Sequence, residues 1–393
     1  MKTHSITSFW AVAMAAMMLG LSCSQDASGT DVVREVIKLL KADVGEAVVL
    51  AYIEREGAPA GLNADAIVEL QRAGATEKII LALMGVSGAG TASGENGYPF
   101  DLDERHTVKK PVVHGALAVY PIIRKGPALP EEYITLDEAV KNKTITIREK
   151  GDGSVPVVIV VNTGRLPIYI SAGEIIIGGK QDRVVAYDAI VRPGREMPIE
   201  VRCVEHGRWG GSRMDFDAAP AMAGRAAKMA AQFEGQQAVW ERVAEQNAAL
   251  KAESSTGSYK ASLSKPEVDA AYREFAAAVL PSLRDGNVAG MVVALNGKVH
   301  AIDMFSSPSL FARLKEKLLK GYLLDALAEG DSHAPPPGPD AIRTFYAETL
   351  RGRTEELKSY EANRNIGRES EKAKASECID PDGEVLHRSL LSK

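Results

Sequence analysis

A block of long polar side chains separates two runs of valine and isoleucine in the middle of the chain. Glu174 comes first, and Lys180, Gln181, Asp182 and Arg183 follow after a pair of glycines. Glycines account for a tight turn, but a turn does not require so many charged groups beside an apolar strand. The block is therefore either a solvated hairpin tip or a ligand site. In a ligand site, Lys180, Gln181 and Arg183 would bind an anion. Glu174 would then be a catalytic carboxylate.

The same stretch narrowly misses the pattern of a phosphate-binding P-loop. Its glycine spacing is off by one, and Gln181 stands where Ser or Thr would hold magnesium. Strand-like residues follow it instead of a helix. We therefore reject a P-loop here.

A second polar block ends a strand-like run at residues 203–209. Strand alternation places Cys203 and Glu205 on one face. Arg208 could bind a carboxylate or phosphate with two hydrogen bonds, and Trp209 could form a stacking wall. Glu205 is the preferred catalytic base, whereas Cys203 is a poor candidate nucleophile because His206, the nearby base, is too close in sequence to point toward it. The alternative is a structural Glu205–Arg208 ion pair beside a buried Trp209.

The two blocks are expected to meet, because consecutive strands usually pair. The site hypothesis predicts one concavity that contains two acids and three cations: Glu174, Lys180, Arg183, Glu205 and Arg208. The competing hypothesis is a network of structural ion pairs, or a scatter of these side chains over the surface.

The order of strand-like and helix-like runs along the chain predicts an α+β fold with a mainly antiparallel sheet and long helices. These elements must position the polar residues described above. Glycine, proline and asparagine signals separate the strand-like runs, and Asn296-Gly297 predicts a type I′ hairpin turn. Thr135 is the expected cap of a short helix. Strands are expected at 117–123, 144–148, 155–161, 166–170, 174–177, 184–191, 197–204, 288–305 and 384–387. Helices are expected at 218–253, 266–283 and 309–328, with a helical or loose segment at 343–374.

Four stretches together resemble the ARPP domain family, which is named for its association with ADP-ribosylglycohydrolases and rhodanese-phosphatases. They are residues 133–139, 173–183, 203–209 and 236–240. The resemblance covers about 112–328 and the final strand, and implies a ligand-binding or enzymatic domain without an established reaction or cofactor. Ile175 stands where the family often has a second acidic residue, and Asp182 where it often has Asn.

The first residues are typical of an export signal. A weakly basic start precedes an apolar run at 9–21, which is too short to span a bilayer comfortably. Leu21-Ser22-Cys23 resembles the lipobox of bacterial lipoproteins, so Cys23 is the expected lipidation site and membrane anchor. Ordinary cleavage nearby, with a soluble product, is the alternative. We expect a signal peptide at 1–22 and a tether at 23–30, on a protein that faces the periplasm or cell exterior.

A helical repeat module is expected at 31–86, because two copies of an apolar helix–break–helix pattern lie 31 positions apart. Thr30 or Asp31 and Asn63 are the expected N-caps. A flexible linker at 87–110, the ARPP-like domain at 111–330 and a C-terminal extension with one last strand at 331–393 complete the expected organisation.

Composition narrows the functional classes. The net charge is -5 and no basic stripe is present, which argues against nucleic-acid binding. None of the seven histidines has metal-ligand spacing, so no structural zinc is expected and no metal-binding residue is predicted. A magnesium site built from carboxylates is the alternative. Cys203 and Cys378 could form a disulfide or remain two separate buried thiols. The leading hypothesis is an envelope-anchored domain that binds, or binds and hydrolyses, a small anionic molecule of the nucleotide or sugar-phosphate class. The alternative is a non-catalytic module that holds an envelope protein.

Overall fold

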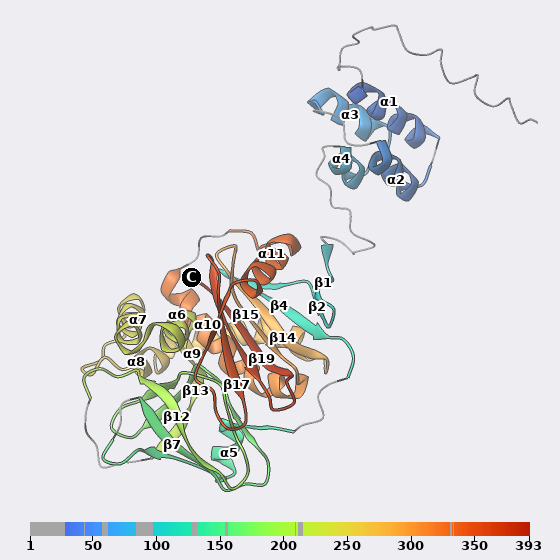
Figure 1. Ribbon diagram of the computed structural model, residues 1–393. Helices are drawn as coiled ribbons and strands as arrows, with labels where there is room; N and C mark the ends of the chain where they lie inside the picture. The colour runs from blue at the N-terminus through green and yellow to red at the C-terminus, as the bar shows by residue number, and fades with distance from the viewer. Residues whose placement is uncertain are drawn as a thin grey trace, which may run out of the picture. The chain divides into compact units, whose positions relative to one another are not determined.

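The computed structural model describes residues 28–42, 44–56, 62–83, 97–127, 132–153, 156–208, 210, 215–330, 332 and 334–393. The chain forms two compact units, residues 1–92 and 93–393 (Figure 1). The expected signal peptide and Cys23 lie outside the described residues. Among the described residues, no helix combines the length and apolar character needed to cross a membrane.

The described part of the first unit contains four helices around a small apolar core. They are α1 (Ser28–Lys41), α2 (Glu46–Glu56), α3 (Ala64–Arg72) and α4 (Glu77–Leu83). Val36, Val49 and Leu70 are fully buried in this core. Asn63 caps α3 by accepting a hydrogen bond from the backbone of Ala66, as expected. The expected cap at 30 or 31 is wrong, because α1 already begins at Ser28.

The second unit is an α+β domain, which confirms the expected fold class. Within the described residues, its largest sheet has ten strands in the order β1-β2-β4-β14-β15-β19-β18-β17-β16, and β3 pairs with β4. The strands of this antiparallel sheet are β1 (Phe100–Asp103), β2 (His106–Val108), β3 (Val112–His114), β4 (Leu117–Arg124), β14 (Val288–Leu295), β15 (Lys298–Phe305), β16 (Arg353–Glu356), β17 (Arg364–Glu369), β18 (Ala373–Ile379) and β19 (Val385–Ser392).

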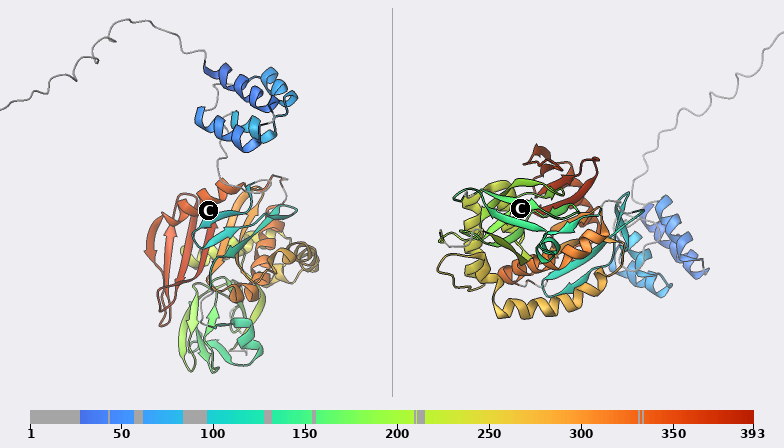
Figure 2. Two further views of the ribbon diagram at one scale, coloured as in Figure 1. Left: turned by 90° about the vertical axis from the view of Figure 1, so that its right-hand side faces the viewer. Right: turned by 90° about the horizontal axis from the view of Figure 1, so that it is seen from below.

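Two smaller sheets form a second layer, drawn in green below the ten-stranded sheet in Figures 1 and 2. One has the order β13-β9-β10-β12-β7-β6 and the other β11-β8-β5. Their strands are β5 (Ile134–Thr135), β6 (Ile145–Glu149), β7 (Val157–Asn162), β8 (Ile168–Ile170), β9 (Glu174–Gly178), β10 (Arg183–Val185), β11 (Ala189–Val191), β12 (Glu196–Cys203) and β13 (Phe216–Met222).

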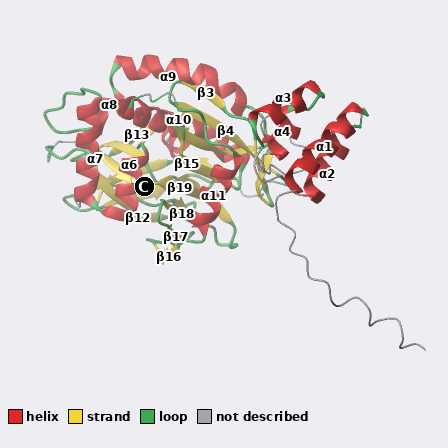
Figure 3. Ribbon diagram, turned by 90° about the horizontal axis from the view of Figure 1, so that it is seen from above, coloured by secondary structure: helices red, strands yellow, loops and turns green. Residues whose placement is uncertain are grey.

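Helices cover both faces of the ten-stranded sheet (Figure 3). On one face, alternate residues of β14 such as Met291 and Val293 pack with α9 (Pro266–Val279), the 3-10 turn Leu280–Leu283 and α10 (Pro308–Glu329). On the other face, Val292 packs with α11 (Pro339–Leu350). The expected helix at 309–328 is α10, and because it also contacts β13 it is buried on several sides.

Two expected elements in the middle of the domain differ from the structure. The run at 184–191 is two strands, β10 and β11, which belong to different sheets. The expected helix at 218–253 begins as strand β13, which pairs with β9, and only then continues as α6 (Arg225–Met229), a π-helical turn (Ala230–Glu234) and α7 (Gln236–Ala249). Sheet pairing outweighs the helix propensity of the alanines in β13.

The C-terminal part also differs from expectation. The segment at 343–374 contains most of α11 followed by β16 and β17, and β19 pairs with both β15 and β18. Residues 331–393 therefore build part of the main sheet instead of extending from it. The expected linker at 87–110 likewise contains β1 and β2. These strands were not predicted because charged side chains on their solvent-facing parts interrupt the apolar pattern of the sequence.

A buried polar network joins the two layers. Asp303 accepts hydrogen bonds from Lys228 Nζ (3.2 Å) and from Tyr322, and its Oδ1 lies 3.2 Å from His387 Nε2. His387 Nδ1 lies 2.8 Å from Asp188 Oδ2. Burial alone would raise the pKa of Asp303, but the charge of Lys228 and the hydrogen bond from His387 lower it overall, so the carboxylate remains ionised.

Candidate functional site

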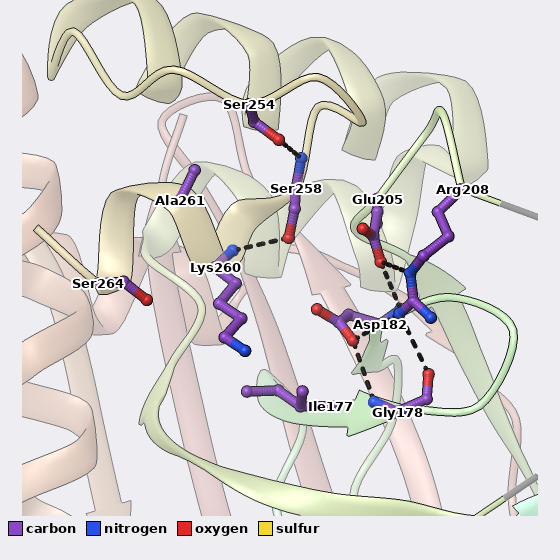
Figure 4. Close-up of a pocket in the computed structure, with 10 residues that line it drawn as sticks. All are labelled: Ile177, Gly178, Asp182, Glu205, Arg208, Ser254, Ser258, Lys260, Ala261 and Ser264. Carbon is purple, nitrogen blue, oxygen red and sulfur yellow. Dashed lines mark hydrogen bonds and ion pairs between the residues drawn. The ribbon is translucent and has the colours of Figure 1, made fainter. Parts of the chain in front are cut away.

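A polar pocket of about 520 Å³ lies where β9, β10 and β12 end against α8 (Tyr259–Leu263) (Figure 4). Gly178 and Gly179 allow the chain to leave β9 in a tight turn, because their φ angles of 135° and 51° are unfavourable for other residues. The lining residues are Ile177, Gly178, Asp182, Glu205, Arg208, Ser254, Ser258, Lys260, Ala261 and Ser264.

Arg208 joins the separate polar blocks on one wall of the pocket. Its Nε donates to Glu205 Oε2 at 2.7 Å, and its Nη2 donates to Asp182 Oδ1 at 3.0 Å. Its Nη1 also donates to the carbonyl of Gly179 at 3.1 Å. The guanidinium is therefore held rigidly between two carboxylates. Because its hydrogen bonds go to these groups and to the backbone, it is less free to bind an anionic ligand.

Both carboxylate oxygens of Glu205 accept hydrogen bonds. Oε1 accepts from the Thr256 hydroxyl at 2.8 Å, and Oε2 accepts from Arg208 and from the backbone N–H of Asp182 at 3.3 Å. Glu205 is 6% exposed and thus ties three segments of the wall together. These contacts fit a residue that positions the site better than one that takes a proton from a ligand.

Asp182 has a different environment from Glu205. Its Oδ1 accepts from Arg208 and from the backbone of Gly178 at 3.0 Å, whereas its Oδ2 has no hydrogen-bond partner among the described residues. Burial raises the pKa of the Asp182 carboxyl; the Gly178 hydrogen bond opposes this shift and the charge of Glu205 adds to it. Asp182 is therefore the better-placed acid–base group of the pocket.

Lys260 provides the second cation. It lies on α8, is exposed, and its ammonium group has no hydrogen bond or ion pair within the described part of the chain. Figure 4 shows its side chain extending toward the side of the pocket that holds Asp182. Ser254 and Ser258 shape this wall, because Ser254 Oγ accepts from the Ser258 backbone and Ser258 Oγ from the Lys260 backbone.

The expected convergence of five charged residues is only partly found. Glu205 and Arg208 line the pocket, but Glu174, Lys180 and Arg183 do not. Glu174 is fully buried at the other end of β9, where it is paired with Lys317 on α10. A carboxylate in that position is enclosed and unable to act in this pocket.

Arg183 and Lys180 point away from the pocket toward β6. Arg183 is fully buried, with its Nη2 3.5 Å from Glu149 Oε1, and the backbone of Lys180 donates to the same oxygen at 2.8 Å. The Lys180 ammonium contacts the carbonyl of Asp152. Arg183 also donates to the carbonyl of Gln181 at 2.8 Å. Strand pairing alone did not predict this direction, because it fixes neighbours but not the partner of each long side chain.

The remaining expected residues lie behind the pocket or beyond the described chain. Gln181 is 4% exposed and donates to the carbonyl of Glu205 at 2.7 Å. Burial raises the pKa of the Cys203 thiol to about 11, and its sulfur donates to Gln181, so a thiolate nucleophile is disfavoured. Cys203 and Cys378 are separate buried thiols. Trp209 lies outside the described residues.

Lys260 and Asp182 line the pocket but were not among the site residues predicted from the sequence. A signal existed for Asp182, which stands inside the polar block, and the nearby Thr256 belongs to the weak family motif at 255–257. Nothing local in the sequence distinguishes Lys260 from other helix lysines. Within the described residues, no group of three or more His, Cys, Asp and Glu side chains could hold a metal ion.

The fold and the pocket together define an α+β domain with a polar cavity large enough for a small ligand. The sequence model of the ARG and Rhodanese-Phosphatase-superfamily-associated Protein domain matches residues 105–391. The match spans most of the chain, so the protein belongs to this family, the ARPP domain family. No curated protein and no solved structure matched the chain.

Proposed function

We propose that the pocket between β9, β12 and α8 binds a small molecule that carries an anionic group and hydroxyls, such as a sugar phosphate or nucleotide. The observation that carries this proposal is the Lys260 ammonium, which has no partner among the described residues and borders a pocket of about 520 Å³. A lysine of this kind can form an ion pair with a phosphate at little cost to the protein.

Other groups of the pocket fit the hydroxyls of such a ligand. Asp182 Oδ2 is an acceptor without a partner among the described residues, and the hydroxyl of Ser264, at the end of α8, is likewise unpaired in that part of the chain. Arg208 forms ion pairs with both Glu205 and Asp182, so Lys260 is the lining cation that has no ion pair among the described residues and can receive an anion. A hydrolytic reaction would need a base, and this proposal assigns that role to Asp182, with Glu205 as the residue that positions the wall.

Replacing Lys260 by glutamine is expected to weaken ligand binding by about tenfold or more, because the change removes the pocket's unpaired cation. Thermal shift and calorimetry on the full chain would use ribose 5-phosphate and AMP as probes, since a ligand that binds the native state raises its Tm. The matched control is Lys298→Gln, an exposed lysine on β15 that does not line this pocket. Equal affinities in both variants would contradict the assignment. No Tm rise with either probe would favour a non-catalytic module that holds an envelope protein.

We also propose that the protein is exported and anchored to the membrane through a lipid on Cys23. The apolar run at 9–21 followed by Leu21-Ser22-Cys23 supports this proposal. Cys23→Ser is expected to move the protein from the membrane fraction to the soluble fraction after cell lysis. The control is Cys378→Ser, because Cys378 is a buried thiol of the folded domain. Retention of the Cys23→Ser variant in the membrane fraction would argue against lipid anchoring.

A further inference from the structure

A second pocket, of about 570 Å³, lies where several strands of the ten-stranded sheet end beside α11. Its walls come from the β1–β2 turn, the end of β4, the end of β15 and the β18–β19 turn. It shares no lining residue with the pocket that contains Lys260. Its chemistry is therefore independent of the proposed function.

An aspartate–histidine pair forms one side of this pocket. His106 Nδ1 lies 2.8 Å from Asp103 Oδ1, which also accepts from the backbone of Arg105 at 2.9 Å. Asp103 Oδ2 accepts from the Tyr346 hydroxyl at 2.6 Å. Burial would raise the pKa of Asp103, but the hydrogen bonds from His106 and Tyr346 lower it overall. An ionised carboxylate therefore orients the imidazole and favours a proton on Nδ1.

The other imidazole nitrogen remains available. His106 Nε2 has no hydrogen-bond partner among the described residues, although the residue is only 9% exposed. In the tautomer with the proton on Nδ1, Nε2 is a hydrogen-bond acceptor. The pair is thus arranged to present Nε2 to a hydroxyl of a ligand.

Arg124 is a cation of the same pocket that lacks an acidic partner. Its Nε donates to the carbonyl of Pro127 at 3.2 Å, and its two outer nitrogens have no partner in the described part of the chain. Burial lowers the pKa of Arg124 and the charge of Arg105 lowers it further, whereas the charges of Glu384 and Asp103 oppose this shift. Neither of these carboxylates forms an ion pair with Arg124, so the half-buried guanidinium gains more from an incoming anion than a paired one does.

Ser306 adds a buried polar group to the lining. It is 4% exposed, and its Oγ is buried without a hydrogen-bond partner among the described residues. A hydroxyl with so little accessible surface does not reach a ligand in the pocket. Arg124 and His106 Nε2 therefore carry the binding, because both border the cavity without partners among the described residues.

We propose that this pocket is a second binding site, which holds a single oxyanion of a small ligand, such as hydrogen phosphate. Its oxygens accept hydrogen bonds from Arg124, and its hydroxyl donates to His106 Nε2. Acidic residues at the rim of the pocket limit the ligand to one oxyanion. Arg105 is paired with Glu384, and the exposed carboxylate of Glu104 has no partner within the described residues. A ligand with many negative charges would be repelled by these acids.

The test uses inorganic phosphate and the full chain, with the His106 imidazole as the local reporter. Long-range ¹H–¹⁵N correlation spectra resolve the ring nitrogens, and His106→Gln identifies the signals of His106 by their loss. Phosphate is expected to shift the Nε2 signal in a saturable way, because its hydroxyl donates a hydrogen bond to that nitrogen. Arg124→Gln should weaken the apparent affinity by about tenfold or more, because a charged bidentate partner is lost.

Three further variants make the result decisive. Arg192→Gln, at an exposed arginine that does not line the pocket, should leave the response unchanged. Glu104→Gln should tighten phosphate binding, because it removes a repulsive charge. If Arg124→Gln does not fold, Arg124→Lys retains the charge but loses the bidentate geometry and should still weaken binding. An unshifted His106 signal, or an affinity that Arg124 variants leave unchanged, would overturn the proposal.

Discussion

Replacing Asp303 by alanine is expected to destabilise the protein by about 3–5 kcal/mol, the usual cost of breaking a fully buried ion pair by removing one partner. Asp303 is 0% exposed, and it is the carboxylate that pairs with Lys228, itself 1% exposed. Without Asp303, the Lys228 ammonium keeps one hydrogen-bond partner within the described residues, the Ser389 hydroxyl at 2.9 Å. The Tyr322 hydroxyl loses its acceptor as well.

The partners of Asp303 explain why its replacement is expected to destabilise several elements of the fold. Lys228 lies on α6, Tyr322 on α10 and His387 on β19, so one carboxylate joins two helices to the ten-stranded sheet. His387 would retain its contact with Asp188. Asp303→Asn keeps the shape and part of the hydrogen bonding, and should cost less than Asp303→Ala because the neutral amide still accepts one hydrogen bond.

Urea unfolding followed by circular dichroism would measure this loss. Asp382→Ala is the matched control, because Asp382 is exposed in the turn before β19 and its side chain has no contact among the described residues. A surface change of this kind usually alters stability by less than about 0.5 kcal/mol. If Asp303→Ala and Asp382→Ala had similar effects, the network would not stabilise the fold as we infer.

The second large effect is expected at the Arg183–Glu149 pair behind the first pocket. Both side chains are 0% exposed, and Arg183 Nε and Nη2 and Glu149 Oε2 are buried without hydrogen-bond partners among the described residues. Desolvation is therefore poorly compensated on both sides. Arg183→Met or Glu149→Met alone should cost about 3–5 kcal/mol, because each change leaves a buried charge without its partner.

Changing both residues should restore much of this stability. The double variant places two flexible apolar side chains in a buried space and leaves no isolated charge, a replacement that is often neutral or stabilising. A double-mutant cycle in urea should thus show a strong interaction between the two sites. Additive losses would mean that the ion pair is not what couples them. Reduced ligand affinity with unchanged stability in Arg183→Met would instead restore Arg183 to the ligand site.

Part of the candidate site could be predicted from the sequence. The polar blocks at 174–183 and 203–209 were recognisable by composition, and they do meet at the Glu205, Arg208 and Asp182 cluster. The direction in which each long side chain points could not be predicted from the sequence. Glu174 and Arg183 lie in strands next to that cluster, yet Lys317 and Glu149, from other elements, hold them elsewhere.

The sequence by itself determined the features that depend on neighbouring residues. Val- and Ile-rich runs form strands, Thr135 and Glu138 form a capping box, and Asn296 and Gly297 adopt the positive φ angles of 51° and 76° that a tight hairpin requires. Each of these depends on local sterics or on a hydrogen bond within a few positions. For that reason the α+β class could be predicted without a template.

Only the tertiary structure decided which distant groups meet. Asp188 and His387 are 199 positions apart, and Asp303 and His387 are 84 apart, yet one buried network holds all three. The same applies to β13, where pairing with β9 outweighs an alanine-rich sequence, and to Arg124 and His106, which gain their pocket from α11 and the β18–β19 turn. Such contacts depend on how sheets and helices pack, and side-chain burial and charge pairing are fixed only once that packing exists.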